Sequence, residues 1–296
     1  MAPTPSGYLH LGNIFSFVLT WLWAKMNNGK ITLRIDDIDN ERYRTSYLFD
    51  IFESLSFLGL DCDAGPKSLE DFETYYSQKN RLGPYNDALH QLVAQGLVYA
   101  CSCTRKEIAE TKTIHACPRK CATLGLPLDT PNTAWRLRIP AHTVVSFRDE
   151  QLGVTTIDVS HAMPDFVVRQ KNGLPAYQIC SLVDDLQSDI THIVRGQDLV
   201  NSTAAQLYLA ALLGEKQFEQ VQFLHHPLLM NKDGKKMSKS AGDYSIKDMR
   251  TNGAGPEDVY KKIFKELHFK ESHEKNLDGL LALLKNKKET PFKMLF

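Results

Sequence analysis

Two short segments, far apart in the sequence, carry the residues best suited to phosphate chemistry. The first, Thr4-Pro5-Ser6-Gly7-Tyr8-Leu9-His10-Leu11-Gly12-Asn13, is a glycine-bearing turn that leads into an apolar stretch, with a histidine at the junction. The second, Lys236-Met237-Ser238-Lys239-Ser240, is a lysine-rich loop after the turn Asp233-Gly234. Charge on a reacting phosphate is stabilised by backbone donors, a polar hydrogen-bond donor and cations at one centre. Together the two segments predict a site for a nucleoside triphosphate.

The elements that must position these segments follow an α/β pattern. Apolar residues from Leu11 predict a buried helix that ends near Asn27-Asn28-Gly29, and the alternation from Lys30 to Ile35 predicts a strand. The acidic cluster Asp36-Asp37-Ile38-Asp39 follows directly, where parallel sheets place ligand sites. The same cluster is also suited to capping the next helix. Helical spacing of apolar residues recurs at 43–59 and 75–98.

A β-rich block interrupts this pattern. Four predicted strands within residues 131–172 are separated by Pro, Gly or Asp, at 134–139, 143–148, 154–159 and 166–169. The α/β pattern then resumes at 177–185, with a strand at 190–196, a helix from Ser202 as its N-cap to Leu213, and a strand at 221–226. The sequence therefore predicts an α/β fold with a domain inserted between two halves of one sheet.

Composition fits an enzyme of this size and narrows its partners. The chain has 296 residues, 43% hydrophobic and 24% charged, which suits one large α/β domain with an insertion, or two domains. Because the formal net charge is zero, a nucleic acid would have to be held by a local basic patch. The apolar run 14–23 has no preceding Lys or Arg and is too short to span a bilayer, so we expect a cytoplasmic protein without a membrane partner.

Four cysteines are concentrated in a short stretch and predict a metal site. Their two close pairs suit tetrahedral Zn²⁺ better than a disulfide framework in a chain of this size. Four thiolates would leave no open coordination position, which predicts a structural ion. His115 is an alternative fourth ligand in place of Cys117. The predicted ligands are Cys101, Cys103, Cys117 and Cys121.

Five motifs in order resemble the class I aminoacyl-tRNA synthetases and, within them, the catalytic half of glutamyl-tRNA synthetases. They are Ala2 to Gly12, Arg34 to Asp39, Ala176-Tyr177-Gln178 with Val183-Asp184-Asp185, Ile193 to Gly196, and Lys236 to Ser240. The resemblance implies a Rossmann-like parallel-sheet catalytic domain in two parts, 1–98 and 173–245. Between them it implies a zinc-binding and β-rich acceptor-binding subdomain at 99–172, and after them a short helical C-terminal region at 246–296.

The resemblance also implies a reaction and its catalytic residues. A glutamate carboxylate attacks the α-phosphate of ATP, supplied with Mg²⁺, to give an acyl-adenylate and pyrophosphate. His10 is implied as a donor to an α-phosphate oxygen, with Lys236 and Lys239 as mobile cations on the pyrophosphate. The implied ATP-binding residues are Gly7, His10, Gly12, Asn13, Lys236, Met237, Ser238 and Lys239.

Glutamate itself is implied to contact four residues. Asp36 takes the α-ammonium group with Tyr177 nearby, Thr4 contacts the substrate backbone, and Arg195 pairs with a carboxylate. Asp36 stands where the family more often has Glu. The family also has an Arg-containing strand before the Ala-Pro pair, whereas this sequence begins at Met1, so either that start is missing or Arg195 serves the side-chain carboxylate.

Within the family, the short chain with a cysteine cluster is most similar to the glutamyl-Q-tRNA(Asp) synthetases. These attach glutamate to the queuosine base of tRNA(Asp), and Leu199 fits that subfamily where glutamyl-tRNA synthetases usually have tryptophan. The alternatives are a glutamyl-tRNA synthetase catalytic portion that charges the tRNA 3′ end, and a non-catalytic tRNA-binding paralogue. We expect a monomer whose last residues, including Lys261, Lys262 and Lys265, form either a solvated helical face or tRNA phosphate contacts.

Overall fold

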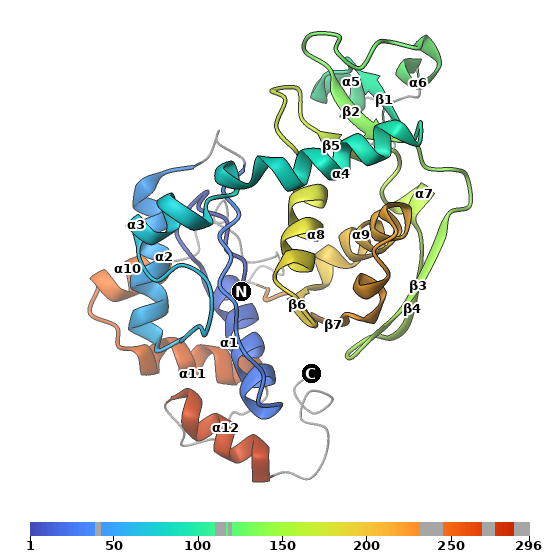
Figure 1. Ribbon diagram of the computed structural model, residues 1–296. Coiled ribbons are helices and arrows are strands. Elements are labelled where there is room, and N and C mark those ends of the chain that lie inside the picture. Colours follow the sequence, from blue (N-terminus) through green and yellow to red (C-terminus); the bar gives the residue numbers. More distant parts are fainter. Residues whose placement is uncertain (39–42, 110–116, 118–119, 231–244, 268–275, 287–296) are drawn as a thin grey trace. The chain divides into compact units, whose positions relative to one another are not determined.

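The computed structural model describes residues 1–38, 43–109, 117, 120–230, 245–267 and 276–286 (Figure 1). These residues form an α/β fold with mixed sheets, divided into two compact units. Unit 1 comprises Met1–Asn80, Ile193–Gln197 and Phe223–Phe296, and unit 2 comprises Arg81–His192 and Asp198–Gln222. None of the helices in the described ranges combines the length and hydrophobicity that a bilayer crossing needs.

Unit 1 is built around α1 (Leu11–Met26) and α2 (Thr45–Leu58). A short α3 (Leu69–Asp71) leads through a π-helical turn, η1 (Phe72–Tyr76), into a 3₁₀ turn, η2 (Gln78–Arg81). Strands β6 (His192–Gly196) and β7 (Gln222–His226) are neighbours in one sheet. The remaining helices of the unit are α10 (Ile246–Thr251), α11 (Pro256–Glu266) and α12 (Leu277–Asn286).

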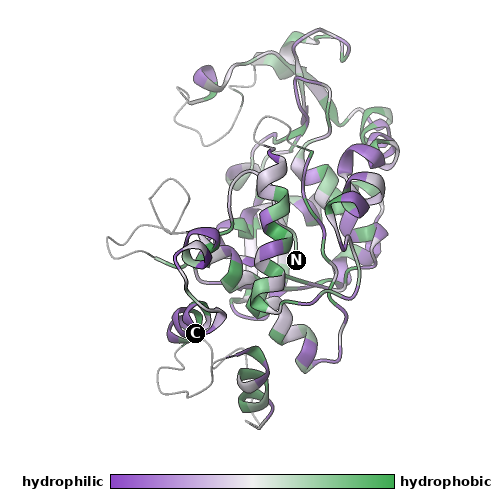
Figure 2. Cartoon of the chain, turned by 90° about the vertical axis from the view of Figure 1, so that its left-hand side faces the viewer, coloured by the Kyte–Doolittle hydropathy of each residue, from purple (hydrophilic) through white to green (hydrophobic). Residues whose placement is uncertain are grey.

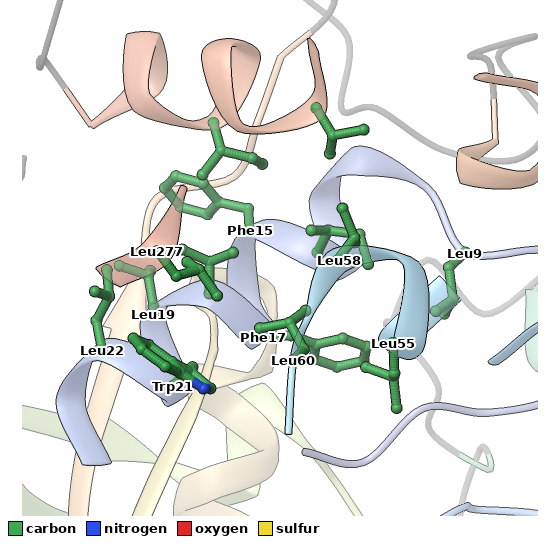
Figure 3. Packing of buried hydrophobic residues seen from close by; sticks show 14 of the residues in the cluster. Leu9, Phe15, Phe17, Leu19, Trp21, Leu22, Leu55, Leu58, Leu60 and Leu277 are labelled. Atoms are coloured by element: carbon green, nitrogen blue, oxygen red, sulfur yellow. The ribbon is translucent and has the colours of Figure 1, made fainter. Parts of the chain in front are cut away.

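The core of unit 1 explains why α1 is apolar on nearly every side. Its side chains pack against α11 and α12 as well as α2, and Figure 3 shows Phe15, Leu19 and Leu22 beside Leu277 of α12. The lowest helix in Figures 1 and 2 is α12, and most of it has the hydrophobic colour. Burial of this kind contributes about 1.5–3 kcal/mol for each large apolar side chain.

Local signals set the ends of the two main helices of unit 1. The α1 helix starts at His10 as N-cap and stops at Asn27. The α2 helix stops at Gly59, whose φ of 64° is the left-handed conformation that favours glycine at a helix end. The predicted helices at 11–27 and 43–59 are therefore confirmed.

Unit 2 starts with α4 (Leu82–Ala94), which leads in Figure 1 to the strands β1 (Val98–Cys101), β2 (Ala134–Leu137) and β5 (Val167–Arg169). These three strands form an antiparallel sheet in the order β1-β2-β5. A second antiparallel pair, β3 (Val144–Asp149) and β4 (Gly153–Asp158), aligns Val144 with Asp158. The helical segments of the unit are α5 (Arg105–Ala109), α6 (Lys120–Leu124), α7 (Val159–Ala162), α8 (Tyr177–Gln187), η3 (Gln197–Leu199), α9 (Val200–Leu213) and η4 (Lys216–Gln220).

The four predicted strands of the β-rich block are confirmed as β2, β3, β4 and β5, whereas three local predictions were wrong. The stretch 30–35 forms only an isolated parallel bridge, from Thr32 to Ala64. Its backbone hydrogen bonds go to separate residues, such as Met1 and Ala64, and not to a continuous partner strand. The helix predicted from residue 75 begins at Leu82, after the turns η1 and η2. Ser202 does not cap α9, because that helix begins at Val200, directly after η3.

Candidate active site

His10 holds the position where the chain enters α1. Its backbone is extended (φ −116°, ψ 170°), its Nδ1 accepts a hydrogen bond from the Gly12 amide at 3.1 Å, and its own amide donates to Asn13 Oδ1 at 3.1 Å. Because Nδ1 accepts, the neutral ring carries its proton on Nε2. His10 is thus both a helix cap and an oriented N–H donor at a helix N-terminus, where anions are favoured.

Gly12 leaves room for that imidazole. A Cβ at this position would lie 3.0 Å from Cε1 and 3.1 Å from Nδ1 of His10. The glycine is therefore explained by the histidine ring, whereas its predicted approach to ATP stays a prediction. Gly7 is buried, and the side chain of Asn13 accepts from the His10 amide.

The segment that follows residues 231–244 is fixed to this first motif. Ser245 forms an isolated antiparallel bridge with His10, and the Ile246 amide donates to the Leu9 carbonyl at 2.8 Å. Lys247 Nζ donates to the Tyr8 hydroxyl at 2.8 Å and lies 4.1 Å from the centroid of its ring. The predicted residues Lys236, Met237, Ser238 and Lys239 lie outside the described residues.

Helix α10 is held on α2 by an ion pair. Arg250 Nη2 lies 2.8 Å from Oδ1 of Asp50, which is buried, and Arg250 Nη1 lies 3.7 Å from the exposed Glu53. Burial raises the pKa of the Asp50 carboxyl, and Arg250 together with the Ser54 hydroxyl offsets part of that rise. Arg250 lies in the last turn of α10, so the pair holds the end of that short helix on the core of unit 1.

Asp36 is the predicted glutamate contact that the structure describes most fully. Its side chain is buried, and its Oδ1 lies 2.6 Å from Arg34 Nε. Its amide donates to the Pro3 carbonyl at 2.9 Å, which places Asp36 beside the first motif and next in space to the backbone that leads to Thr4. Thr4 itself is exposed. Asp36 does not cap α2, whose N-cap is Arg44, and Asp39 lies outside the described residues.

The other two predicted glutamate contacts lie in different units. Arg195 is a buried residue of β6 in unit 1. Tyr177 is the first residue of α8 in unit 2, after the N-cap Ala176, and its side chain is 37% exposed.

Sequence reasoning missed that Ser77 and Gln78 form hydrogen bonds to the acidic cluster at Asp36 and Asp37. Ser77 Oγ donates to Asp37 Oδ2 at 2.6 Å, and the Gln78 amide donates to Asp37 Oδ1 at 2.8 Å. The Gln78 side chain reaches Asp36. No local pattern connects the acidic cluster to a Ser-Gln pair some forty residues later, so only the fold brings them together.

The four predicted cysteines are confirmed as a cluster. Their sulfur atoms all lie within 4.8 Å of one another, and Cys103 Sγ is 3.5 Å from both Cys117 Sγ and Cys121 Sγ. Tetrahedral Zn²⁺ with thiolates at about 2.3 Å would separate the sulfur atoms by roughly 3.8 Å. The donor set therefore fits zinc with little adjustment. His115 lies outside the described residues.

The thiols of this cluster differ in acidity. Burial raises the pKa of Cys101, and burial with hydrogen bonds to Cys117 and Cys121 raises that of Cys103. At Cys121 burial acts in the same direction, but hydrogen bonds from the Ser102 backbone, Cys103 and the Ser102 hydroxyl outweigh it and lower the pKa to about 7. A cation in the cluster would complete the deprotonation of the set.

The fold and the start of α1 at His10 are followed by a sequence match that assigns the protein to a family. Residues 1–277 match the family model of the class I tRNA synthetases (E and Q), catalytic domain, and the chain belongs to that family. It is accordingly a ligase of the aminoacyl-tRNA synthetase type, of the glutamate-activating group.

Individual relatives show which enzymes of the family the chain is similar to. The chain is 38% identical over 250 residues to a glutamyl-Q tRNA(Asp) synthetase of Burkholderia cenocepacia (strain HI2424), covering 81% of this chain and 79% of the relative. It is 34% identical over 265 residues to a glutamate–tRNA ligase of Dichelobacter nodosus (strain VCS1703A), covering 87% of this chain but 54%, about half, of that ligase.

Among solved structures, a glutamate-tRNA synthetase from Elizabethkingia anophelis superposes with a TM-score of 0.76 at 23% identity. The match covers 95% of this chain and 64% of that one, so this chain spans less than two thirds of its length. At this identity the likeness supports the fold.

Proposed function

We propose that the protein uses ATP to activate L-glutamate as glutamyl-adenylate and transfers the glutamyl group to the queuosine base of tRNA(Asp). The observation that carries the activation step is the bridge between His10 and Ser245, which ties the end of the 231–244 segment to the oriented imidazole. The acceptor follows the relatives named glutamyl-Q tRNA(Asp) synthetase, which this chain matches over most of their length.

In the proposed activation step, a glutamate carboxylate oxygen attacks the α-phosphorus of ATP while the bond to pyrophosphate breaks. His10 Nε2–H donates to an α-phosphate oxygen, where charge builds in the transition state. Lys236 and Lys239 neutralise the departing pyrophosphate, and Mg²⁺ accompanies the ATP. Gly7, Gly12, Asn13, Met237 and Ser238 are proposed to line the nucleotide.

Glutamate recognition is proposed to use opposite charges at its two ends. The buried carboxylate of Asp36 receives the α-ammonium group, and the buried Arg195 pairs with a carboxylate of the substrate. Thr4 is proposed to contact the substrate backbone. The proposal for Tyr177 rests on the resemblance of its motif.

We further propose that the cysteine cluster holds one structural Zn²⁺. Cys101, Cys103, Cys117 and Cys121 would supply four thiolates, and an ion held in this way orders the segments around β1 and α6 without an open position for catalysis. The ion is proposed to shape the acceptor-binding subdomain at 99–172. We also propose that residues 1–98 and 173–245 form the two catalytic parts and that residues 246–296 form a short helical region. The protein is proposed to act as a monomer in the cytoplasm.

Two assays test the function. The protein alone should catalyse glutamate-dependent ATP–pyrophosphate exchange, and it should label tRNA(Asp) that carries queuosine but not the same tRNA with guanosine at that position. Lys236→Ala and Lys239→Ala should each lose exchange while the melting temperature stays unchanged, with the exposed Lys216→Ala as control. Full exchange in both loop variants would contradict the assigned roles.

A second candidate is favoured by the match to the Dichelobacter nodosus ligase over 87% of this chain. In that case the glutamyl group would go to the 3′-terminal ribose of tRNA. Removal of the 3′-terminal adenosine of the tRNA separates the two acceptors, because it abolishes labelling at the 3′ end and spares labelling of the base. A chain that binds tRNA but shows neither exchange nor transfer would be a non-catalytic paralogue.

A further inference from the structure

Gln78 is a fully enclosed polar residue next to the predicted glutamate contact. It is 1% exposed and begins η2, one residue after the end of the π-helical turn η1. Its amide and the Ser77 hydroxyl both donate to the carboxylate of Asp37, at 2.8 Å and 2.6 Å. Asp37 therefore fixes the backbone of Gln78 against the acidic cluster.

The Gln78 side chain contacts the residues before and after Asp37 in the sequence. Its Oε1 accepts from the Ile38 amide at 3.0 Å, and its Nε2 lies 3.4 Å from Asp36 Oδ1. Because the amide group uses its acceptor and its donor at once, its orientation is determined by the backbone of the cluster.

The two oxygens of Asp36 are consequently unlike. Oδ1 faces Arg34 Nε at 2.6 Å and Gln78 Nε2 at 3.4 Å, whereas among the described residues Oδ2 contacts only Arg34 Nη2, at 3.4 Å. A guanidinium beside a carboxylate favours two parallel hydrogen bonds. Arg34 holds both oxygens in this way but unequally, and Gln78 adds its contact on the Oδ1 side, so Oδ2 is the less engaged oxygen.

We propose that Gln78 is a positioning residue for glutamate recognition, which holds Asp36 so that Oδ2 receives the substrate's α-ammonium group. This inference rests on the proposed function. Without the Gln78 donor, the Asp36 carboxylate can rotate toward a symmetric two-point pair with Arg34, in which Oδ2 is more fully engaged and offers less charge to the substrate.

The test compares two substitutions in the glutamate-dependent exchange assay. Gln78→Met keeps the volume and removes both hydrogen bonds. Gln78→Glu keeps an acceptor for the Ile38 amide, replaces the donor to Asp36 by an oxygen and, when ionised, adds a negative charge beside Asp36 and Asp37. Both should raise KM for glutamate about tenfold or more at pH 8, the effect of losing a hydrogen bond to a charged group, while KM for ATP stays within about twofold of the wild type.

A pH series separates positioning from simple core filling. The charged groups around residue 78 are Arg34, Asp36, Asp37 and Lys79, the last of which lies 3.7 Å from Asp37 Oδ2. In Gln78→Glu, the neighbouring carboxylates raise the pKa of the introduced carboxyl, and its protonated form can donate to Asp36. Its KM for glutamate should therefore move toward the wild-type value as the pH falls from 8 to 6, and that of Gln78→Met should not.

Two controls make the result decisive, and the pH series covers a variant that does not fold. Gln91→Met removes a side-chain bond to the Leu213 carbonyl in unit 2 and should change neither KM. In an Asp36→Asn background, Gln78→Met should add no further rise in KM for glutamate. If Gln78→Met fails to fold, the pH series of Gln78→Glu decides alone.

The possible failures are distinguishable. A wild-type protein without glutamate-dependent exchange would overturn the proposed function and this inference together. An active wild type whose KM for glutamate is unchanged in Gln78→Met, or rises equally for ATP, would overturn the inference alone. A Gln78→Glu variant whose KM does not respond to pH would do the same.

Discussion

The backbone of His10 pairs with the backbone of Ser245 in an isolated antiparallel bridge, so the first residue after the 231–244 segment is fixed to the N-cap of α1. Ser245, the residue that follows this segment, is therefore held next to the residue that carries the imidazole. In the proposed mechanism, a substitution at Ser245 would change how Lys236 and Lys239 reach the phosphate without replacing either lysine.

The two roles of His10 can be separated by substitution. Asn is a good N-cap, so His10→Asn should keep α1 stable but lose the Nε2 donor, and exchange should fall about 10²–10³-fold. His10→Ala should lose both roles and cost about 1 kcal/mol of unfolding free energy in addition. Pyrophosphate exchange and chemical denaturation measure the two effects. Equal activity of His10→Asn and the wild type would exclude the imidazole as a donor.

Gly12→Ala tests whether the glycine serves the histidine ring. The new Cβ would lie 3.0 Å from His10 Cε1, so the ring must shift, and we expect exchange to drop about tenfold or more. Alanine favours the helix by up to about 1 kcal/mol over glycine, so the melting temperature should not fall by much. Gly83→Ala in α4 is the matched control, because a Cβ there meets nothing within 4 Å. Activity of that control should be unchanged.

The pair between Asp50 and Arg250 makes stability depend on pH. Arg250→Ala leaves the buried Asp50 carboxylate without its ion-pair partner and should cost about 2 kcal/mol or more at pH 7. The pKa of Asp50, already raised by burial, would rise further, so its neutral form becomes accessible in the folded protein. The deficit relative to wild type should therefore shrink as the pH falls toward the range in which Asp50 takes up its proton.

Thermal melts between pH 4.5 and 7.5 measure this dependence. Glu53→Ala is the control, since Glu53 is exposed and 3.7 Å from Arg250, and it should change the unfolding free energy by less than about 0.5 kcal/mol. A deficit in Arg250→Ala that stays constant across this range would contradict the assignment to Asp50.

Zinc content should track the cysteine cluster and the pH. Cys117→Ser should lower the zinc bound per chain and the melting temperature, whereas Cys62→Ser, outside the cluster, should retain the metal. Because the thiols must be deprotonated to bind the ion, retention should weaken as the pH falls. Elemental analysis after dialysis at pH 6 and pH 8 measures it. Glutamate-dependent exchange should persist in Cys117→Ser if the ion serves tRNA binding.

Patterns with a local cause were predictable from the sequence. The apolar spacing of α1 and α2, the stop at Gly59 and the four strands of the β-rich block need no information from distant residues. The cysteine cluster was predictable because two close pairs suit one ion. The prediction that Ser202 caps α9 was wrong because η3 had already started the turn into that helix. The Ser202 hydroxyl instead accepts a hydrogen bond from the Gln178 side chain at 3.2 Å.

Contacts that depend on distant chain segments were not predictable. The stretch around Thr32 alternates like a strand. Its backbone hydrogen bonds, however, go to distant residues: the Arg34 amide donates to the Met1 carbonyl, and the Leu33 amide donates to the Ala64 carbonyl. Such partners cannot be read from the stretch itself. The same reason hides Gln78, which gains its importance only because Asp37 holds it beside Asp36.

The packing of α1 against α12 has a consequence for synthesis on the ribosome. Phe15 and Leu19 belong to α1, and Leu277 belongs to α12, which is synthesised much later. The face of α1 that α12 covers therefore stays exposed until the residues of α12 have emerged. Because closing so long a loop is slow, nascent chains should depend on chaperones at this helix, and stop codons before α12 should yield aggregating products.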